Sequence, residues 1–300
     1  MITKKQHPRW NEVLRSNDCN GIAKHLAKGI NPSETVLWHE GHAASPPLCI
    51  AWKAPALRLL LEAGADPNGV QELPPNPREN WNYNLSYPLH CAASRENPEA
   101  LEVLIEHGAK ILKSGPCKSQ DPIWQAILSV SSKKGLAAVR VLLSHFGKQH
   151  VKKHGASLLV VAAGNKSRRG IIGDLVELGA DPNESHRGLC LPLQEAIREN
   201  NASGVEQLLE VGADPQANSP KASGYYGDNI LSCIELAKKL KKRKLVSLLE
   251  AAVKSQPKKT AKTKAVAKTA GKKKATVKKT TKKTVTRKKA GKKKAARKKK

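Results

Sequence analysis

Apolar residues recur along much of the chain at the spacing of one face of a short α-helix, and these runs end alike. The clearest run, 59–63, is followed by Gly-Ala-Asp-Pro-Asn at 64–68. The ending recurs at 179–183 and 212–215, with a weaker copy at 108–110. Because glycine ends helices in the left-handed backbone region and Asp-Pro favours a turn, each copy predicts a helix followed by a tight turn. Such repetition indicates one structural unit copied along the chain.

A second motif opens each unit. Its best copy is Tyr-Pro-Leu-His-Cys-Ala-Ala at 87–93, and looser copies begin at 46, 121, 157, 191 and 232, so that successive starts are 34 to 41 residues apart. Together the two motifs resemble the ankyrin repeat family, whose period is about 33 residues. The resemblance covers roughly residues 8–252. It implies an all-α solenoid of about six to seven helix-turn-helix repeats, each burying its apolar face on its neighbours.

The predicted ankyrin repeat domain spans residues 1–253. After a degenerate N-terminal repeat, further repeats are expected near 46–68, 87–112, 121–147, 157–183 and 191–216, with a C-terminal cap at 232–252. The fourth repeat lacks the Gly-Ala-Asp-Pro ending, whereas the fifth and sixth are regular. Terminal repeats are expected to be atypical because one of their faces meets water.

Charge divides the chain into two parts. The whole sequence has 54 Lys and Arg against 25 Asp and Glu, a net charge of +29. Residues 254–300 hold 23 of these basic residues and no acidic one, and 238–244 hold six more, whereas 1–237 hold 25 basic and 24 acidic residues. Residues 254–300 are predicted to be disordered because they cannot bury enough apolar surface to fold. The asymmetry predicts a polyanionic partner for one end of the chain.

The basic residues of this tail come in short clusters separated by Ala, Thr, Val and Gly. The candidate polyanion-binding residues are Lys272, Lys273, Lys274, Lys278, Lys279, Lys282, Lys283, Arg287, Lys288, Lys289, Lys292, Lys293, Lys294, Arg297, Lys298, Lys299 and Lys300. In composition the tail resembles those of linker histones and bacterial histone-like proteins, which implies binding to DNA or RNA without base readout, driven by counterion release. A solubility segment and a nuclear-localisation signal are the alternatives.

Aromatic residues are scarce, and several fall in or next to predicted loops between repeats. The candidate partner-binding residues are Trp38, Trp81, Tyr83, Tyr87, Tyr225 and Tyr226. The resemblance implies that a protein partner binds on these loops and the concave face beside them, and aromatic side chains are favoured interface anchors. The alternative is that each ring packs within its own loop, because Tyr and Trp serve both uses.

The histidine and aspartate residues within the two motifs have predicted structural roles. The resemblance implies that His90 ties a loop to the start of a helix through hydrogen bonds, and no acid or thiol is placed to make it catalytic. The aspartates of the helix-ending motif are predicted to cap turns. These are Asp66, Asp181 and Asp214.

No cofactor or metal site is predicted. His39 with His42, and His150 with His154, have ligand-like spacings, but two ligands do not complete a zinc site. The six cysteines are scattered, so small buried apolar residues in a reducing compartment are expected. Neither a signal peptide nor a membrane-spanning segment is predicted.

The sequence therefore predicts a non-enzymatic adapter. Its solenoid recognises a protein partner, and its tail binds DNA, RNA or another polyanion. Two alternatives remain open, a histone-like protein that condenses nucleic acid and a host-directed effector whose tail is a nuclear address. The expected location is the cytoplasm or nucleoid of a bacterium, or the nucleus of a eukaryotic or host cell.

Overall fold

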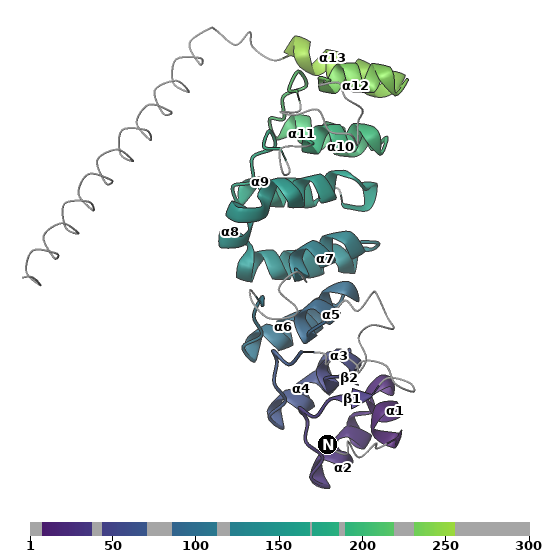
Figure 1. Ribbon diagram of the computed structural model, residues 1–300, viewed down its shortest axis with the longest axis vertical. Helices are drawn as coiled ribbons and strands as arrows, with labels where there is room; N and C mark the ends of the chain where they lie inside the picture. The colour runs from purple at the N-terminus through teal and green to yellow at the C-terminus, as the bar shows by residue number, and fades with distance from the viewer. Residues whose placement is uncertain are drawn as a thin grey trace, which may run out of the picture. The chain divides into compact units, whose positions relative to one another are not determined.

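The computed structural model describes residues 8–37, 44–70, 86–112, 121–168, 170–185, 190–218 and 231–255. Most of these residues lie in α-helices (Figure 1). The helices are α1 (Pro8–Ser16), α2 (Cys19–Ala27), α3 (Pro47–Ile50), α4 (Ala54–Glu62), α5 (Pro88–Ser94), α6 (Pro98–Glu106), α7 (Pro122–Ser129), α8 (Lys133–Ala163), α9 (Ile171–Glu177), α10 (Pro192–Arg198), α11 (Ala202–Glu210), α12 (Cys233–Lys239) and α13 (Arg243–Ser255), with a 3-10 turn at Lys166–Arg168. The chain divides into two units, 1–250 and 251–300, and only the first five residues of the second are described.

The helices of the first unit stack in successive pairs, as the resemblance implied. The first helix of a pair contacts the first helix of the next, as α3 does with α5, and second helices stack likewise, as α4 does with α6. The layers follow one another in chain order (Figure 1). Buried apolar side chains form one cluster from Trp10 to Leu249 that runs through all the layers. The predicted all-α repeat solenoid is therefore confirmed.

The helix-ending motifs form the turns that the sequence predicts. The backbone φ angle is positive, between 80° and 98°, at Gly29, Gly64, Gly108, Gly179 and Gly212. Residues with a side chain rarely adopt this left-handed backbone conformation, which explains the glycine at each of these positions. The predicted aspartate role is also confirmed, since Oδ1 accepts the backbone N–H two residues later at 2.8–3.0 Å in Asp66, Asp181 and Asp214.

The asparagine that follows Asp-Pro joins one repeat to the next. The Asn183 side chain donates to the carbonyl oxygen of Gly212 at 3.0 Å and accepts the N–H of Asp214 at 2.7 Å. Asn68 bridges in the same way to the backbone at 108–110. Each bridge satisfies two backbone groups of the following turn, so it fixes the register of successive repeats.

A short β-ladder was not predicted. It joins β1 (Val36–Leu37) and β2 (Ala44–Ser45) as antiparallel strands, just before the repeat predicted near 46–68. Val36 pairs with Ser45 and Leu37 with Ala44. Two residues per strand are too few to register as a period-2 pattern in the sequence.

The largest departure from prediction is α8. A repeat boundary near 147 and a new first helix at 157 were expected, but 31 residues are helical without interruption. The N-cap Ser132 bonds Glu96 of the preceding pair, and Ala163 at the other end accepts a hydrogen bond from Asn201 at 2.8 Å. One helical segment thus supplies the second helix of the fourth repeat and the first helix of the fifth. Residues 144–156 contain neither proline nor Asp-Pro, and the two glycines there, Gly147 and Gly155, disfavour the helix without ending it.

Two glycines in helices should respond to alanine in opposite ways. At Gly155 in α8, a Cβ atom would lie 3.0 Å from Cβ and 3.2 Å from Cα of Ala180, whereas at Gly173 in α9 nothing lies within 4 Å. Alanine is favoured over glycine in a helix interior by about 1 kcal/mol. We therefore expect Gly173→Ala to raise the free energy of unfolding by about 0.5–1 kcal/mol. Gly155→Ala should lower it by about 1–2 kcal/mol through overpacking.

Urea denaturation followed by circular dichroism would measure both variants. Equal stabilisation by the two substitutions would show that α8 and the turn at Ala180 are not packed closely.

Candidate interaction site

Of the six candidate aromatic anchors, only Tyr87 lies among the described residues. Tyr87 is the N-cap residue of α5, and its side chain is fully buried in the core. The prediction that Tyr87 contacts a partner is therefore corrected, because a ring packed between two layers presents no surface. The remaining candidates lie outside the described residues and stay predictions: Trp38, Trp81, Tyr83, Tyr225 and Tyr226.

Among the described residues, three large apolar side chains that the sequence did not single out are exposed. Trp52 and Leu128 are 43% exposed and Leu240 is 37% exposed. Trp52 and Leu240 lie in the turns that join the two helices of a pair, and Leu128 lies one residue from the end of α7. The Lys53 ammonium is 5.3 Å from the centre of the Trp52 ring, which is cation–π distance. The sequence offers one signal for Trp52 and Leu240, since each is an apolar residue at a turn where other repeats carry polar residues.

A histidine and an aspartate tie the start of α7 to the middle of α8. Asp121 caps α7 by accepting the N–H of Ile123 at 2.9 Å, and its second oxygen lies 2.7 Å from Nε2 of His150. The His154 ring stacks 4.7 Å from that of His150. Burial opposes ionisation of Asp121, but the hydrogen bond and positive charge of His150 outweigh it and lower the pKa of the carboxyl group. Burial also lowers the pKa of His154.

These groups do not form a metal centre. Within the described ranges, no three His, Cys, Asp or Glu residues are arranged to hold a metal ion. The second predicted histidine pair, His39 and His42, lies outside those ranges. His90 is 8% exposed, and burial lowers its pKa, which favours the neutral imidazole. Its predicted hydrogen bonds to the loop stay a prediction.

The described cysteines are free thiols, as expected for scattered cysteines, and the described helices are not of the membrane-spanning kind. Three of the five described cysteines are buried, and all five are free thiols: Cys19, Cys49, Cys91, Cys190 and Cys233. Burial raises the pKa of Cys233 to about 12, so this thiol is unreactive at neutral pH. In the part of the chain that the structure describes, no helix combines the length and apolar character of a bilayer span.

A shallow depression of about 550 Å³ lies on the first half of α8. Its lining residues are Lys133, Leu136, Ala137, Arg140, Val141 and Ser144. Arg140 forms an ion pair with Asp174 of α9 at 2.9 Å. The lining contains no nucleophile paired with a base, so its chemistry is that of a surface contact and not of catalysis.

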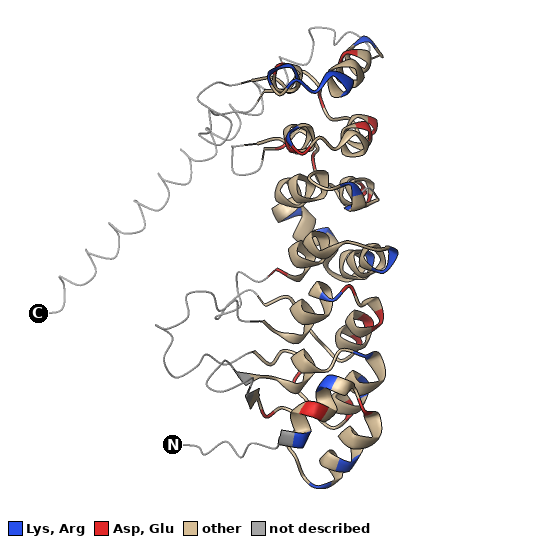
Figure 2. Ribbon diagram, turned by 90° about the vertical axis from the view of Figure 1, so that its right-hand side faces the viewer, with Lys and Arg blue, Asp and Glu red and all other residues tan. Residues whose placement is uncertain are grey.

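Charged side chains recur at one end of the helix pairs and cluster at one turn of the other end. Glutamate is the last residue of the second helix in four repeats, at Glu62, Glu106, Glu177 and Glu210. The opposite end carries the turn that joins α12 to α13, and there Lys and Arg occupy five positions (Figure 2). We call Lys239, Lys241, Lys242, Arg243 and Lys244 the cap turn.

Comparison with known proteins agrees with this geometry. The ankyrin repeat family model matches residues 84–115, which include α5 and α6. The human ASB11 ankyrin repeat domain is 22% identical, with a TM-score of 0.61 and an alignment covering 83% of this chain and 98% of that chain. The ankyrin repeat domain of Bcl-3, a member of the IkappaB protein family, is 17% identical, with a TM-score of 0.58 and coverage of 80% and 97%.

The fold is that of an ankyrin-repeat domain. Such domains generally act as scaffolds for protein–protein interaction, through extended surfaces made by several repeats. The ankyrin-repeat domain of this chain accordingly implies a protein partner. The candidate polyanion-binding residues of the tail, from Lys272 to Lys300, lie outside the described residues.

Proposed function

We propose that this protein is a non-enzymatic adapter whose ankyrin-repeat domain holds a protein partner while its tail binds DNA or another polyanion without sequence specificity. The observation that carries the proposal is the separation of charge. Residues 254–300 hold 23 Lys and Arg and no acidic residue, whereas residues 1–237 hold 25 basic and 24 acidic residues. A segment of this kind neutralises phosphates and releases counterions.

Within the described residues, the titratable side chains support an adapter better than an enzyme. Asp121 and His150 hold α7 against α8, and the aspartates of the repeats cap turns. A catalytic site requires a nucleophile, a base and a group that orients it around a common cavity. The apolar residues exposed at the helix-pair turns, Trp52 and Leu240, instead suit contact with a protein surface.

Salt-dependent DNA binding tests the tail. Full-length protein should bind a 20-bp duplex at 50 mM salt and lose about 10³–10⁵ in affinity by 200 mM if six to ten phosphates are contacted. A chain ending at residue 255 should lose most of this affinity, and duplexes of unrelated sequence should bind alike. Fluorescence anisotropy across a salt series gives both results. Equal binding by the shortened chain would refute the tail's role, and no binding by either chain would make the tail a targeting or solubility element.

A further inference from the structure

The cap turn concentrates positive charge on the folded domain itself. Lys239, Lys241, Arg243 and Lys244 are exposed, and Lys242 is half-buried. Glu250 is the only acidic residue between Lys239 and the C-terminus, and its carboxylate pairs with Lys238 at 3.0 Å. Among the described residues, the five cations of the cap turn have no ion-pair partner. Their charge therefore faces water uncompensated.

The backbone holds this turn in a fixed conformation. The N–H of Lys241 bonds the carbonyl oxygen of Lys238 at 3.0 Å, and the N–H of Lys242 bonds that of Ala237 at 2.9 Å. Lys241 has a φ of 55°, in the left-handed region. The cations thus project from an ordered turn.

The fold does not require lysine at these positions. In the corresponding turns of the first and sixth helix pairs, the left-handed residues are Asn17 and Asn200, and asparagine tolerates that conformation better than lysine. The first turn of α13 carries Arg243 and Lys244 and no acidic residue, and positive charge near a helix N-terminus is unfavourable by about 0.3–1 kcal/mol. Neighbouring like charges add repulsion. The fold thus bears a local cost that a bound polyanion would remove.

We propose that the cap turn is a second nucleic-acid contact of this protein, and that it binds the phosphate backbone of duplex DNA. The inference rests on the proposed function, because the same chain carries a polybasic tail that begins ten residues after Lys244. The ordered turn contributes phosphate contacts in addition to those of the tail. Lys and Arg side chains on an ordered turn neutralise phosphates without reading bases.

The test compares two full-length variants with equal loss of charge. The first removes the cap turn, as Lys239→Gln, Lys241→Asn, Lys242→Gln, Arg243→Gln and Lys244→Gln, with asparagine at 241 because Asn17 and Asn200 show that it suits this conformation. The control replaces five exposed lysines away from the helix-pair turns by glutamine: Lys24, Lys28, Lys110, Lys148 and Lys152. Circular dichroism and thermal melting establish that both variants are folded.

The readout is the slope of log affinity against log salt for a 20-bp duplex. Each phosphate contact contributes about 0.9 to the magnitude of this slope. If about four of the five cap-turn cations contact phosphates, the slope of the cap-turn variant should be smaller in magnitude by about 3–4, and that of the control by less than about 1. An equal decrease of the slope in both variants would show that only net charge matters, and it would overturn the proposal. An unchanged slope in the cap-turn variant would also overturn it, while leaving the tail as the tether.

Two further results separate this inference from the function on which it rests. Absence of DNA binding by the unaltered chain would refute both proposals together. If the cap-turn variant loses affinity for vesicles of anionic lipid but not for DNA, the assigned partner is wrong although the charged surface is real.

Discussion

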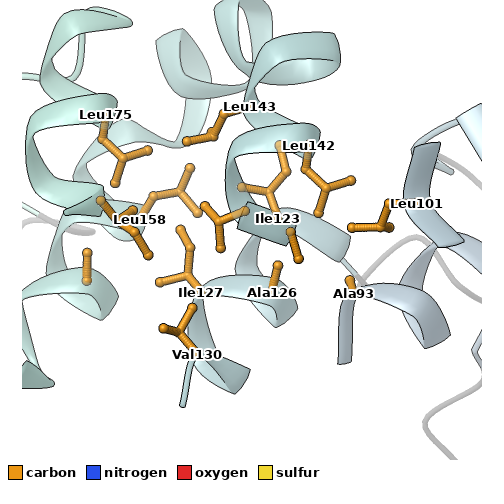
Figure 3. Packing of buried hydrophobic residues seen from close by; sticks show 14 of the residues in the cluster. Ala93, Leu101, Ile123, Ala126, Ile127, Val130, Leu142, Leu143, Leu158 and Leu175 are labelled. Carbon is orange, nitrogen blue, oxygen red and sulfur yellow. The ribbon is translucent and has the colours of Figure 1, made fainter. Parts of the chain in front are cut away.

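Replacement of Leu142 by alanine is expected to destabilise the ankyrin-repeat domain by about 2–5 kcal/mol. Leu142 is completely buried in α8. Figure 3 shows it on the side of Leu101 and Ile123, whereas its neighbour Leu143 lies toward Leu175. Removing three carbon atoms here leaves a cavity at the junction of α6, α7 and α8, which the fixed helix backbones cannot fill.

Urea denaturation followed by circular dichroism measures this loss, and the slope with denaturant should stay unchanged if only stability is altered. Leu128→Ala is the matched control, because Leu128 is 43% exposed and its truncation should cost less than about 1 kcal/mol. A loss below about 1 kcal/mol for Leu142→Ala would contradict the packing described for α8.

Replacement of Asp121 by alanine is expected to cost about 2–3 kcal/mol. The change removes the N-cap of α7, worth about 0.5–2 kcal/mol, together with the charge-assisted hydrogen bond to His150. The imidazole would be left without this partner, in a site where the His150 side chain is only 14% exposed. Asp121→Asn is the informative control, because asparagine caps a helix as well as aspartate does but carries no charge.

Acidic pH should reduce the difference between unaltered protein and Asp121→Asn. Because the pKa of Asp121 is lowered in the folded protein, its contribution to stability is fully present above the ordinary aspartate pKa of about 3.9. The contribution is lost as pH falls through the lowered value. Denaturation at pH 7 and at decreasing pH would measure this, and a difference that stayed constant down to pH 2 would contradict the assignment. Adding His150→Ala to each variant isolates the coupling between the two residues.

The repeat architecture could be predicted because its signals are local. Gly-Ala-Asp-Pro carries within four residues both the glycine that needs positive φ and the aspartate that caps the turn, as Gly179 and Asp181 show. The apolar spacing then indicates which face of each helix is buried. Neither inference requires knowledge of distant parts of the chain.

Features made by distant residues could not be predicted in the same way. Asp121 and His150 are 29 positions apart, and only the course of α8 brings them together. The sequence does not predict the continuous helix, because the family period and Gly147 both indicate a repeat boundary near 147. Tyr87 is a candidate anchor in the sequence because it borders a loop, but the stacking of the layers encloses its ring.

The uninterrupted course of α8 also affects how this array can change in length. Repeat proteins gain and lose whole units at junctions that are alike, so that the cut ends rejoin in register. Between Lys133 and Ala163 this chain has no such junction, because one helix belongs to two units. Excision of either unit would sever the helix, so the fourth and fifth repeats can be deleted, duplicated or exchanged only as one block. Modular engineering of this scaffold should therefore place its boundaries at the glycine turns on either side, Gly-Ala-Lys at 108–110 and Gly-Ala-Asp-Pro at 179–182.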